Sequence, residues 1–153
     1  MAVIEIRTAT VADAKALAEL RWEFRSVQNP AVETHDAFVR RCAGWMRREL
    51  QDGSDWKTWV AVQDHVIVGQ VWLHTVGKIP NPVAELEHLA YISNLFVRPS
   101  SRGGTGTRLL EAALDWCREN RIERIVLWPS RRSVTLYLAH GFTREGDVME
   151  LKL

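Results

Sequence analysis

The segment from Asn94 to Leu110 constrains the fold of this chain more than any other part of its sequence. It reads NLFVRPSSRGGTGTRLL, so an apolar strand runs into Pro99, a glycine-rich turn follows, and an amphipathic helix begins near Thr105. Glycines keep side chains out of the turn, and the first amides of a helix have no partner within it. Because those amides lie at the positive end of the helix dipole, the segment predicts an anion site, and phosphate is the usual anion.

Length and composition predict one globular domain over residues 1–153. The chain is 46% apolar and 25% charged, which is ordinary for a folded domain of this size. Its 20 basic and 19 acidic residues give a net charge of +1, so no strongly basic face is expected for nucleic acid. We find no secretion signal, no run of apolar residues long enough to cross a membrane, and no spacing of Cys and His typical of zinc. We therefore expect a cytoplasmic protein with no metal, no membrane contact and no nucleic-acid partner.

Hydrophobic periodicity predicts the element order β-α-α-β-β-β-α-β-α-β. The expected strands cover residues 3–7, 58–63, 66–75, 86–97, 122–128 and 148–153, with a tight hairpin at Asp64-His65. The expected helices cover residues 11–24, 35–50, 105–120 and 130–140. Helices alternate with strands only in the second half, so we expect an α/β (α+β) fold with a mixed sheet covered on both faces.

The element order, the glycine turn and the segment LYLAHGF, residues 136–142, together resemble the GNAT superfamily of acyl-CoA-dependent N-acyltransferases. The resemblance covers essentially the whole chain and includes the opening strand and helix, IEIRTATVADA, which is typical of bacterial members. It implies a mixed central sheet of six to seven strands that splay apart around a CoA channel. It also implies direct transfer of acetyl from acetyl-CoA to a primary amine of a small molecule, through a ternary complex with no acyl-enzyme.

The glycine turn departs from the family pattern by one residue. The family's turn reads Arg or Gln, two residues, Gly, one residue, then Gly or Ala, whereas here Arg102 is followed by GGTG and the Leu109-Leu110 pair arrives one residue early. Either the turn has lost one residue or Ser101 occupies the basic position. We favour the loss, because Val97-Arg98-Pro99 then keeps its usual distance from Arg102.

The resemblance implies two parts to the cofactor site. The turn would bind the pyrophosphate, and the backbone of the strand before it would pair with the pantetheine arm. The expected cofactor-binding residues are Leu95, Phe96, Val97, Arg102, Gly103, Gly104, Thr105, Gly106, Thr107, Ser130 and Tyr137. The plainer interpretation of the turn is that it only starts a helix.

Three residues are the expected catalytic groups. The resemblance implies that the Leu95 N–H stabilises the oxyanion and that the Tyr137 phenol protonates the departing thiolate. Tyr137 could instead be a buried helix residue beside Phe142. Glu87 is the candidate general base, and the alternative is a solvated carboxylate at the end of a strand.

Trp22, Tyr91 and Asn94 are the expected acceptor-binding residues. Tyr91 occupies the position near the acetyl group where relatives sometimes carry a glutamate, and Asn94 could orient the amine or a water. A flat indole could hold an amine-bearing molecule, although core packing is the competing interpretation of Trp22. Small-molecule amines, amino-sugar antibiotics and peptide N-termini all remain open as acceptors.

Two other functions were compared with acetyl transfer. A non-catalytic acyl-CoA-binding sensor or scaffold would explain the shortened turn. A P-loop nucleotide hydrolase is excluded, because no Gly-Lys-Ser/Thr follows the turn. A homodimer is a common assembly among relatives and is one option here.

Overall fold

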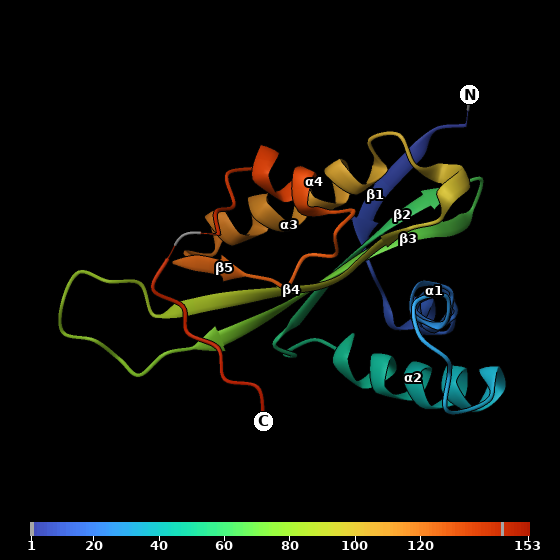
Figure 1. Cartoon of the computed structure of the whole chain (residues 1–153), viewed down its shortest axis with the longest axis horizontal. Coiled ribbons are helices and arrows are strands. Elements are labelled where there is room, and N and C mark those ends of the chain that lie inside the picture. The colour runs from blue at the N-terminus through green and yellow to red at the C-terminus, as the bar shows by residue number, and fades with distance from the viewer. Residues whose placement is uncertain (1, 145) are drawn as a thin grey trace.

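One five-stranded mixed sheet forms the centre of the fold (Figure 1). The computed structural model describes residues 2–144 and 146–153. The strands lie in the order β1 (Ile4–Thr8), β2 (Trp56–Gln63), β3 (Val66–Gly77), β4 (His88–Val97) and β5 (Arg124–Val126). The first four pair antiparallel, and β5 pairs parallel with β4. The mixed sheet was predicted correctly, but the expectation of six to seven strands is wrong, because the sheet has five.

The predicted final strand over residues 148–153 is absent. This segment pairs with no strand among the described residues, and the side chains of Val148, Met149 and Leu151 are 68%, 95% and 82% exposed. The neighbouring edge is short, since β5 has three residues and is soon followed by Pro129, which has no amide hydrogen to donate. A sheet edge of that length offers few hydrogen bonds to hold another strand.

Helices cover both faces of the sheet, as predicted (Figure 1). Helices α1 (Ala14–Ser26) and α2 (His35–Glu49) pack on one face, and α3 (Thr105–Glu119) and the short α4 (Val134–Ala139) lie on the other. Two 3-10 turns, η1 (Val11–Asp13) and η2 (Pro99–Ser101), precede α1 and α3. The apolar stripe of α3 is fully or nearly fully buried and consists of Leu109, Leu110, Ala113, Leu114 and Cys117.

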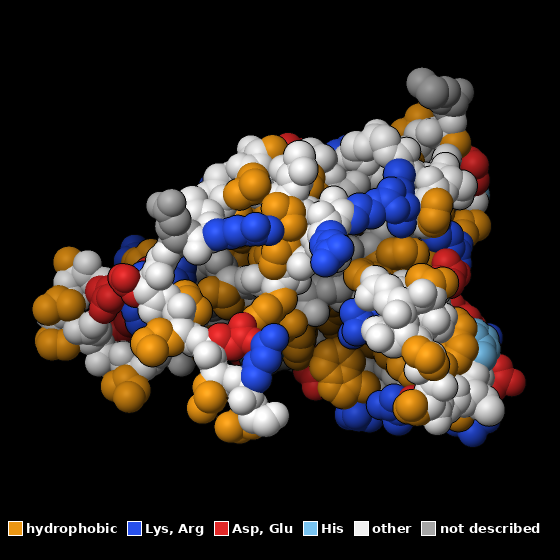
Figure 2. Space-filling model, in the orientation of Figure 1, with side chains coloured by type: hydrophobic (Ala, Val, Ile, Leu, Met, Phe, Trp, Pro, Cys, Tyr) orange, Lys and Arg blue, Asp and Glu red, His pale blue; other side chains and the backbone are white. Residues whose placement is uncertain are grey.

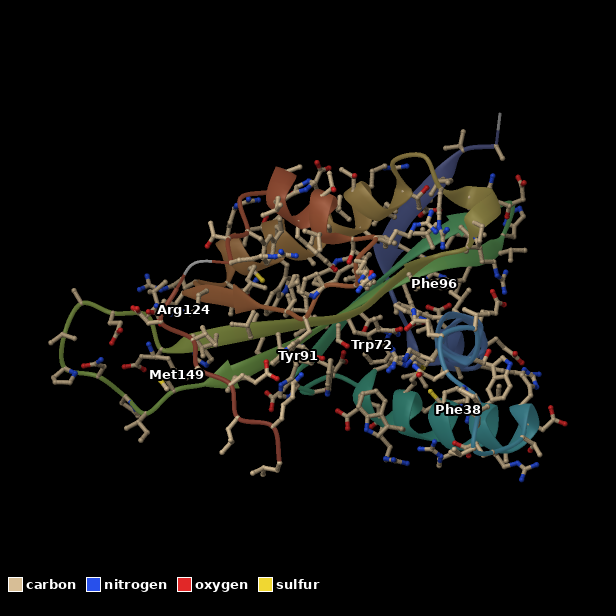
Figure 3. All side chains as sticks on the ribbon, in the orientation of Figure 1. Phe38, Trp72, Tyr91, Phe96, Arg124 and Met149 are labelled. Atoms are coloured by element: carbon tan, nitrogen blue, oxygen red, sulfur yellow. The ribbon has the colours of Figure 1, made fainter. Side chains whose placement is uncertain are left out.

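The two faces have separate hydrophobic cores. Strand side chains alternate between them, so Val71 and Leu73 enter the core under α3 while Trp72 enters the core under α1 and α2. Figure 3 shows Trp72 on the same side of the sheet as Phe38 of α2.

A buried glutamine fixes α1 to the sheet. The Gln70 side chain is 0% exposed; its Nε2 donates to the carbonyl oxygen of Leu17 at 3.1 Å, and its Oε1 accepts from Trp72 Nε1 at 2.8 Å. A buried amide is stable only when its polar atoms are paired, so these bonds set the position of α1 over β3.

Two turns have well-defined local geometry, and the predicted hairpin at Asp64-His65 is confirmed. Asp64 and His65 join β2 to β3 with φ of 49° and 65°, the left-handed pair that a two-residue hairpin requires. Thr10 and Asp13 form a capping box, and Asp13 also pairs with Arg7 at 2.8 Å.

Candidate active site

The glycine turn leaves the start of α3 open. Gly103 and Gly104 have φ of 112° and 100°, and a Cβ built at either would meet nothing within 4 Å. Gly104 is the N-cap of α3 and has no side chain to cap the helix, so the first amides of α3 have no partner in the helix or in a cap. The Thr105 hydroxyl, however, donates to the Ser101 carbonyl at 2.6 Å and is buried. Thr105 can therefore offer a ligand only its amide.

Two arginines stand together at this turn. Arg102 Nε donates to the Val97 carbonyl at 3.0 Å, which holds the guanidinium against the end of β4. Burial and the nearby charge of Arg132 lower the pKa of Arg102. Neither arginine makes an ion pair within the described residues, so the pair can accept an anion. Sequence reasoning missed Arg132, although a basic residue two positions after Ser130 and just before α4 is a signal that could have found it.

The expected cofactor segments converge on Gly106. A Cβ built there would lie 4.0 Å from Val97 Cγ2 on β4 and 4.0 Å from Leu136 Cδ2 on α4. Ser130 lies in the turn before α4, where its hydroxyl shares a hydrogen bond of 2.9 Å with Ser133. The end of β4, the start of α3 and α4 thus lie close together around Gly106.

A bulge in β4 takes Asn94 and Leu95 out of the regular pairing with β3. The β3–β4 register pairs Trp72 with Ser93 and Gln70 with Phe96, so Asn94 and Leu95 together lie opposite the single residue Val71. Asn94 has φ of 58°, a left-handed conformation that asparagine tolerates better than most residues.

The other edge of β4 is also free at this point. Strand β5 pairs with β4 only at Leu89–Tyr91, so the two strands stop pairing before the bulge. Leu95 consequently has no partner residue in the register with β3 or β5 among the described residues. The resemblance implies that these two strands splay apart, and β5 pairs with β4 at no residue beyond Tyr91.

Tyr137 is buried in the same core that Leu95 borders. Its side chain is 7% exposed, and the centroid of its ring lies 5.4 Å from that of Phe142, so the expected packing beside Phe142 is present. Burial raises the pKa of the phenol to about 12. No described group forms a hydrogen bond with the Tyr137 hydroxyl. If that hydroxyl were also fully buried, it would be a buried polar atom without a partner, but the Thr58 hydroxyl is the one such side-chain atom among the described residues. The Tyr137 hydroxyl must therefore reach open space, where it can donate to a ligand.

Glu87 is not brought to this site. It precedes β4 at the far end from Leu95, eight residues away, which corresponds to about 26 Å along a strand. Its carboxylate accepts a hydrogen bond of 3.0 Å from the Asn81 amide. The geometry favours the alternative interpretation, a partly exposed carboxylate that orders a loop.

The three expected acceptor residues lie on the α1–α2 side of the sheet. Tyr91 lies on that side in Figure 3, and the centroid of its ring is 5.5 Å from that of Trp128. Asn94 Oδ1 accepts a hydrogen bond from Arg21 Nη1 at 3.2 Å. Trp22 lies further out on α1, where it contacts His35 and Phe38 and lines a cavity of about 210 Å³. The structure thus places Tyr91 and Asn94 on one strand, and Arg21 connects Asn94 to the cavity beside Trp22.

The family can now be assigned from the sequence match. The model of the Acetyltransferase (GNAT) family matches residues 14–142, which contain every site element described above. The chain belongs to the GNAT acetyltransferase family. No curated protein matches it significantly.

Solved GNAT structures share this fold over nearly their whole length. A GCN5-related N-acetyltransferase from Ralstonia eutropha is 24% identical with a TM-score of 0.78, covering 98% of this chain and 99% of its own. A predicted acetyltransferase from Clostridium acetobutylicum, solved with acetyl-CoA, is 21% identical with a TM-score of 0.77 and coverage of 98% and 96%. Glucosamine-6-phosphate N-acetyltransferase from Arabidopsis thaliana is 19% identical with a TM-score of 0.72 and 98% coverage of both chains.

The residues of this GNAT protein fit acetyl-CoA, the co-substrate that the family uses. The turn offers open glycines and unpaired helix amides, Arg102 and Arg132 offer positive charge, and β4 has at its bulge a residue, Leu95, that pairs with neither neighbouring strand. Figure 2 shows a recess between the two helix layers, with hydrophobic side chains on its floor and Lys and Arg side chains on its border. The described residues hold no cluster of three or more His, Cys, Asp or Glu that could bind a metal ion. None of their helices is both long and apolar enough to span a bilayer.

Proposed function

We propose that residues 1–153 act as one N-acetyltransferase domain, which transfers acetyl from acetyl-CoA directly to a primary amine of a small molecule. The observation that carries this proposal is the bulge in β4. It takes Leu95 out of the pairing with β3, beside the core that contains Tyr137 and one residue from the acceptor-side Asn94. The proposed donor for the carbonyl oxygen and the proposed donor for the leaving group thus belong to residues of one hydrophobic core.

The residues divide the reaction between them. Acetyl-CoA supplies a thioester; a C–N bond forms to the amine nitrogen while the C–S bond breaks. The Leu95 N–H donates to the carbonyl oxygen as negative charge develops on it, a stabilisation that needs no reorganisation because the bulge already fixes the amide. The Tyr137 hydroxyl gives its proton to the departing sulfur and recovers one from solvent.

The raised pKa of Tyr137 keeps the phenol protonated, as a hydrogen-bond donor to the sulfur must be. With a pKa of about 12, the phenol keeps its proton at any physiological pH. The proposal assigns no side chain to the proton that the amine loses, because Glu87 lies at the other end of β4.

The cysteines support direct transfer without an acyl-enzyme. Cys117 is 2% exposed, and burial raises the pKa of its thiol to about 11. Burial also raises the pKa of the Cys42 thiol. A thiol acts as a nucleophile through its thiolate, so neither cysteine suits a covalent step.

Two measurements test the proposal together. Acetyl-CoA should raise the melting temperature, and thiol release from acetyl-CoA should appear with a subset of primary amines. The Tyr137→Phe variant should lower kcat about 100-fold, because general acid catalysis contributes on that order, while its Kd for acetyl-CoA stays within about twofold. Its melting temperature serves as the control for packing.

The outcomes separate enzyme from sensor. If acetyl-CoA stabilised the protein but no amine caused thiol release, the protein would be a non-catalytic acyl-CoA sensor, the function that the shortened turn also allows. Full activity of Tyr137→Phe would remove the proton-donor role. No stabilisation at millimolar acetyl-CoA would overturn the cofactor assignment itself.

A further inference from the structure

Arg21 is a partly buried cation between α1 and β4. Its Nη1 donates to Asn94 Oδ1 at 3.2 Å, the one hydrogen bond that the guanidinium makes within the described residues. Burial is the main cause that lowers its pKa, and the positive charge of Arg25 lowers it further. An arginine remains charged in either case, so the charge is held in a poorly solvated place, where its partners are the neutral Asn94 amide and the Phe24 ring, whose centroid lies 6.0 Å from the guanidinium carbon; neither carries a negative charge.

The carboxylates around Arg21 are already paired with other cations. Glu19 pairs with His35 at 2.6 Å, Glu23 pairs with Arg98 at 2.7 Å, and Glu33 pairs with Arg41. Across residues 2–144 and 146–153, neither Arg21 nor Arg25 takes part in an ion pair. Burying a charge without a counter-charge is costly, which indicates that an anion from outside the chain completes this site.

Both arginines open onto the same cavity. The cavity of about 210 Å³ between α1 and the start of α2 is lined by Arg21, Arg25, Trp22 and Phe38, the last of which is labelled in Figure 3. Arg25 is exposed and its Nη1 donates to Gln28 Oε1 at 3.1 Å. The cavity thus combines aromatic walls with two guanidinium groups, a combination suited to a small organic anion.

Arg21 also connects this cavity to the point of acetyl transfer. Its partner Asn94 belongs to the β4 bulge and directly precedes Leu95. A molecule that binds Arg21 through one end can therefore extend its amine towards the acetyl group that the Leu95 N–H would hold.

We propose that the acceptor is an amine that also carries a carboxylate or phosphate group, and that Arg21 binds this anion with Arg25 as the outer cation. This inference rests on the proposed function and specifies the substrate class. It disfavours polycationic amino-sugar antibiotics, because the single carboxylate lining the cavity, that of Glu33, is already paired with Arg41.

Binding to the CoA-loaded protein tests the inference without turnover. Isothermal titration would compare two matched pairs: glucosamine 6-phosphate with glucosamine, and L-alanine with L-alaninamide. A hydrogen-bonded charge pair predicts that, in at least one pair, the member with the phosphate or carboxylate group binds about tenfold or more tightly than the member without it. The pair that discriminates also distinguishes a phosphate from a carboxylate. Equal or undetectable binding of both members in both pairs would overturn the inference.

Two arginine variants locate the effect. Arg21→Gln should abolish the discrimination while leaving the Kd for CoA within about twofold, and circular dichroism would check its fold. Arg40→Gln, on the exposed face of α2, removes an equal charge away from the cavity and should leave the discrimination intact. Retained discrimination in Arg21→Gln would refute the assignment to Arg21. Anion discrimination without acetyl transfer would refute only the proposed enzyme, whereas transfer to amines without discrimination would refute only this inference.

Discussion

Replacing Gly104 with alanine should separate backbone strain from loss of cofactor binding, because the chain offers a matched control. Gly104 in the candidate pyrophosphate turn and Gly53 in the turn after α2 have φ of 100° and 87°, and a Cβ at either meets nothing within 4 Å. An L residue in this region costs about 1–2 kcal/mol, and the stiffer unfolded chain returns about 0.4–1 kcal/mol. Each alanine should therefore destabilise the fold by a net amount of up to about 1.6 kcal/mol.

The two variants should differ only in binding. Thermal unfolding should give similar decreases in Tm, about 2–4 °C for each kcal/mol at this chain length. Titration with acetyl-CoA should give a Kd raised about tenfold or more for Gly104→Ala, because its methyl group would stand between the phosphates and the helix amides. Gly53→Ala should bind like the wild type. Equal affinities in the two variants would refute the assignment of the turn.

Three further predictions concern stability and reactivity. Tyr137 has a pKa raised from about 10 to about 12, so its contribution to stability is complete below pH 10 and is lost as the pH rises towards 12. Urea unfolding should therefore give a lower free energy of unfolding at pH 11 than at pH 9, and the difference should be smaller in Tyr137→Phe. Gln70→Leu should lower the free energy of unfolding by about 2–4 kcal/mol, because it leaves the Leu17 carbonyl and Trp72 Nε1 buried without partners; a loss below about 0.5 kcal/mol would mean that water replaces the amide. Cys117 should react with an aromatic disulfide at pH 8 far more slowly in the native than in the urea-unfolded protein, since its thiol is buried with a pKa of about 11; rapid native labelling would show that α3 opens readily.

Much of the fold could be predicted from local signals in the sequence. The helix from Thr105 appears where the glycine turn and the apolar stripe placed it, and the Asp64-His65 hairpin follows from residues that suit a tight turn. The final strand failed because alternation alone does not form a strand. Pairing needs a partner edge, and the three-residue length of β5 cannot be read from the apolar run over residues 122–128.

The candidate site was predictable only where its chemistry is carried by a motif. The turn and Tyr137 have recognisable spacing, and the structure leaves the amides of the turn and the Tyr137 hydroxyl without partners. The bulge at Asn94 depends on the register between β3 and β4, which no local pattern reveals, although asparagine at that position is compatible with positive φ. Arg21 looks like one of several helix arginines in the sequence. It differs from them because Glu19, Glu23 and Glu33 form ion pairs with other residues, and those pairs depend on the tertiary structure.

The separation of the two hydrophobic cores has a consequence for how this protein can evolve. The residues proposed to bind acetyl-CoA border the core under α3, whereas α1 and α2, with Arg21 and Trp22, rest on the opposite core. A change of side chain in one core does not have to be accommodated by packing in the other, because the sheet lies between them. Selection could therefore exchange one acceptor for another by remodelling α1 and α2, while the apparatus that handles the acetyl donor is inherited unaltered.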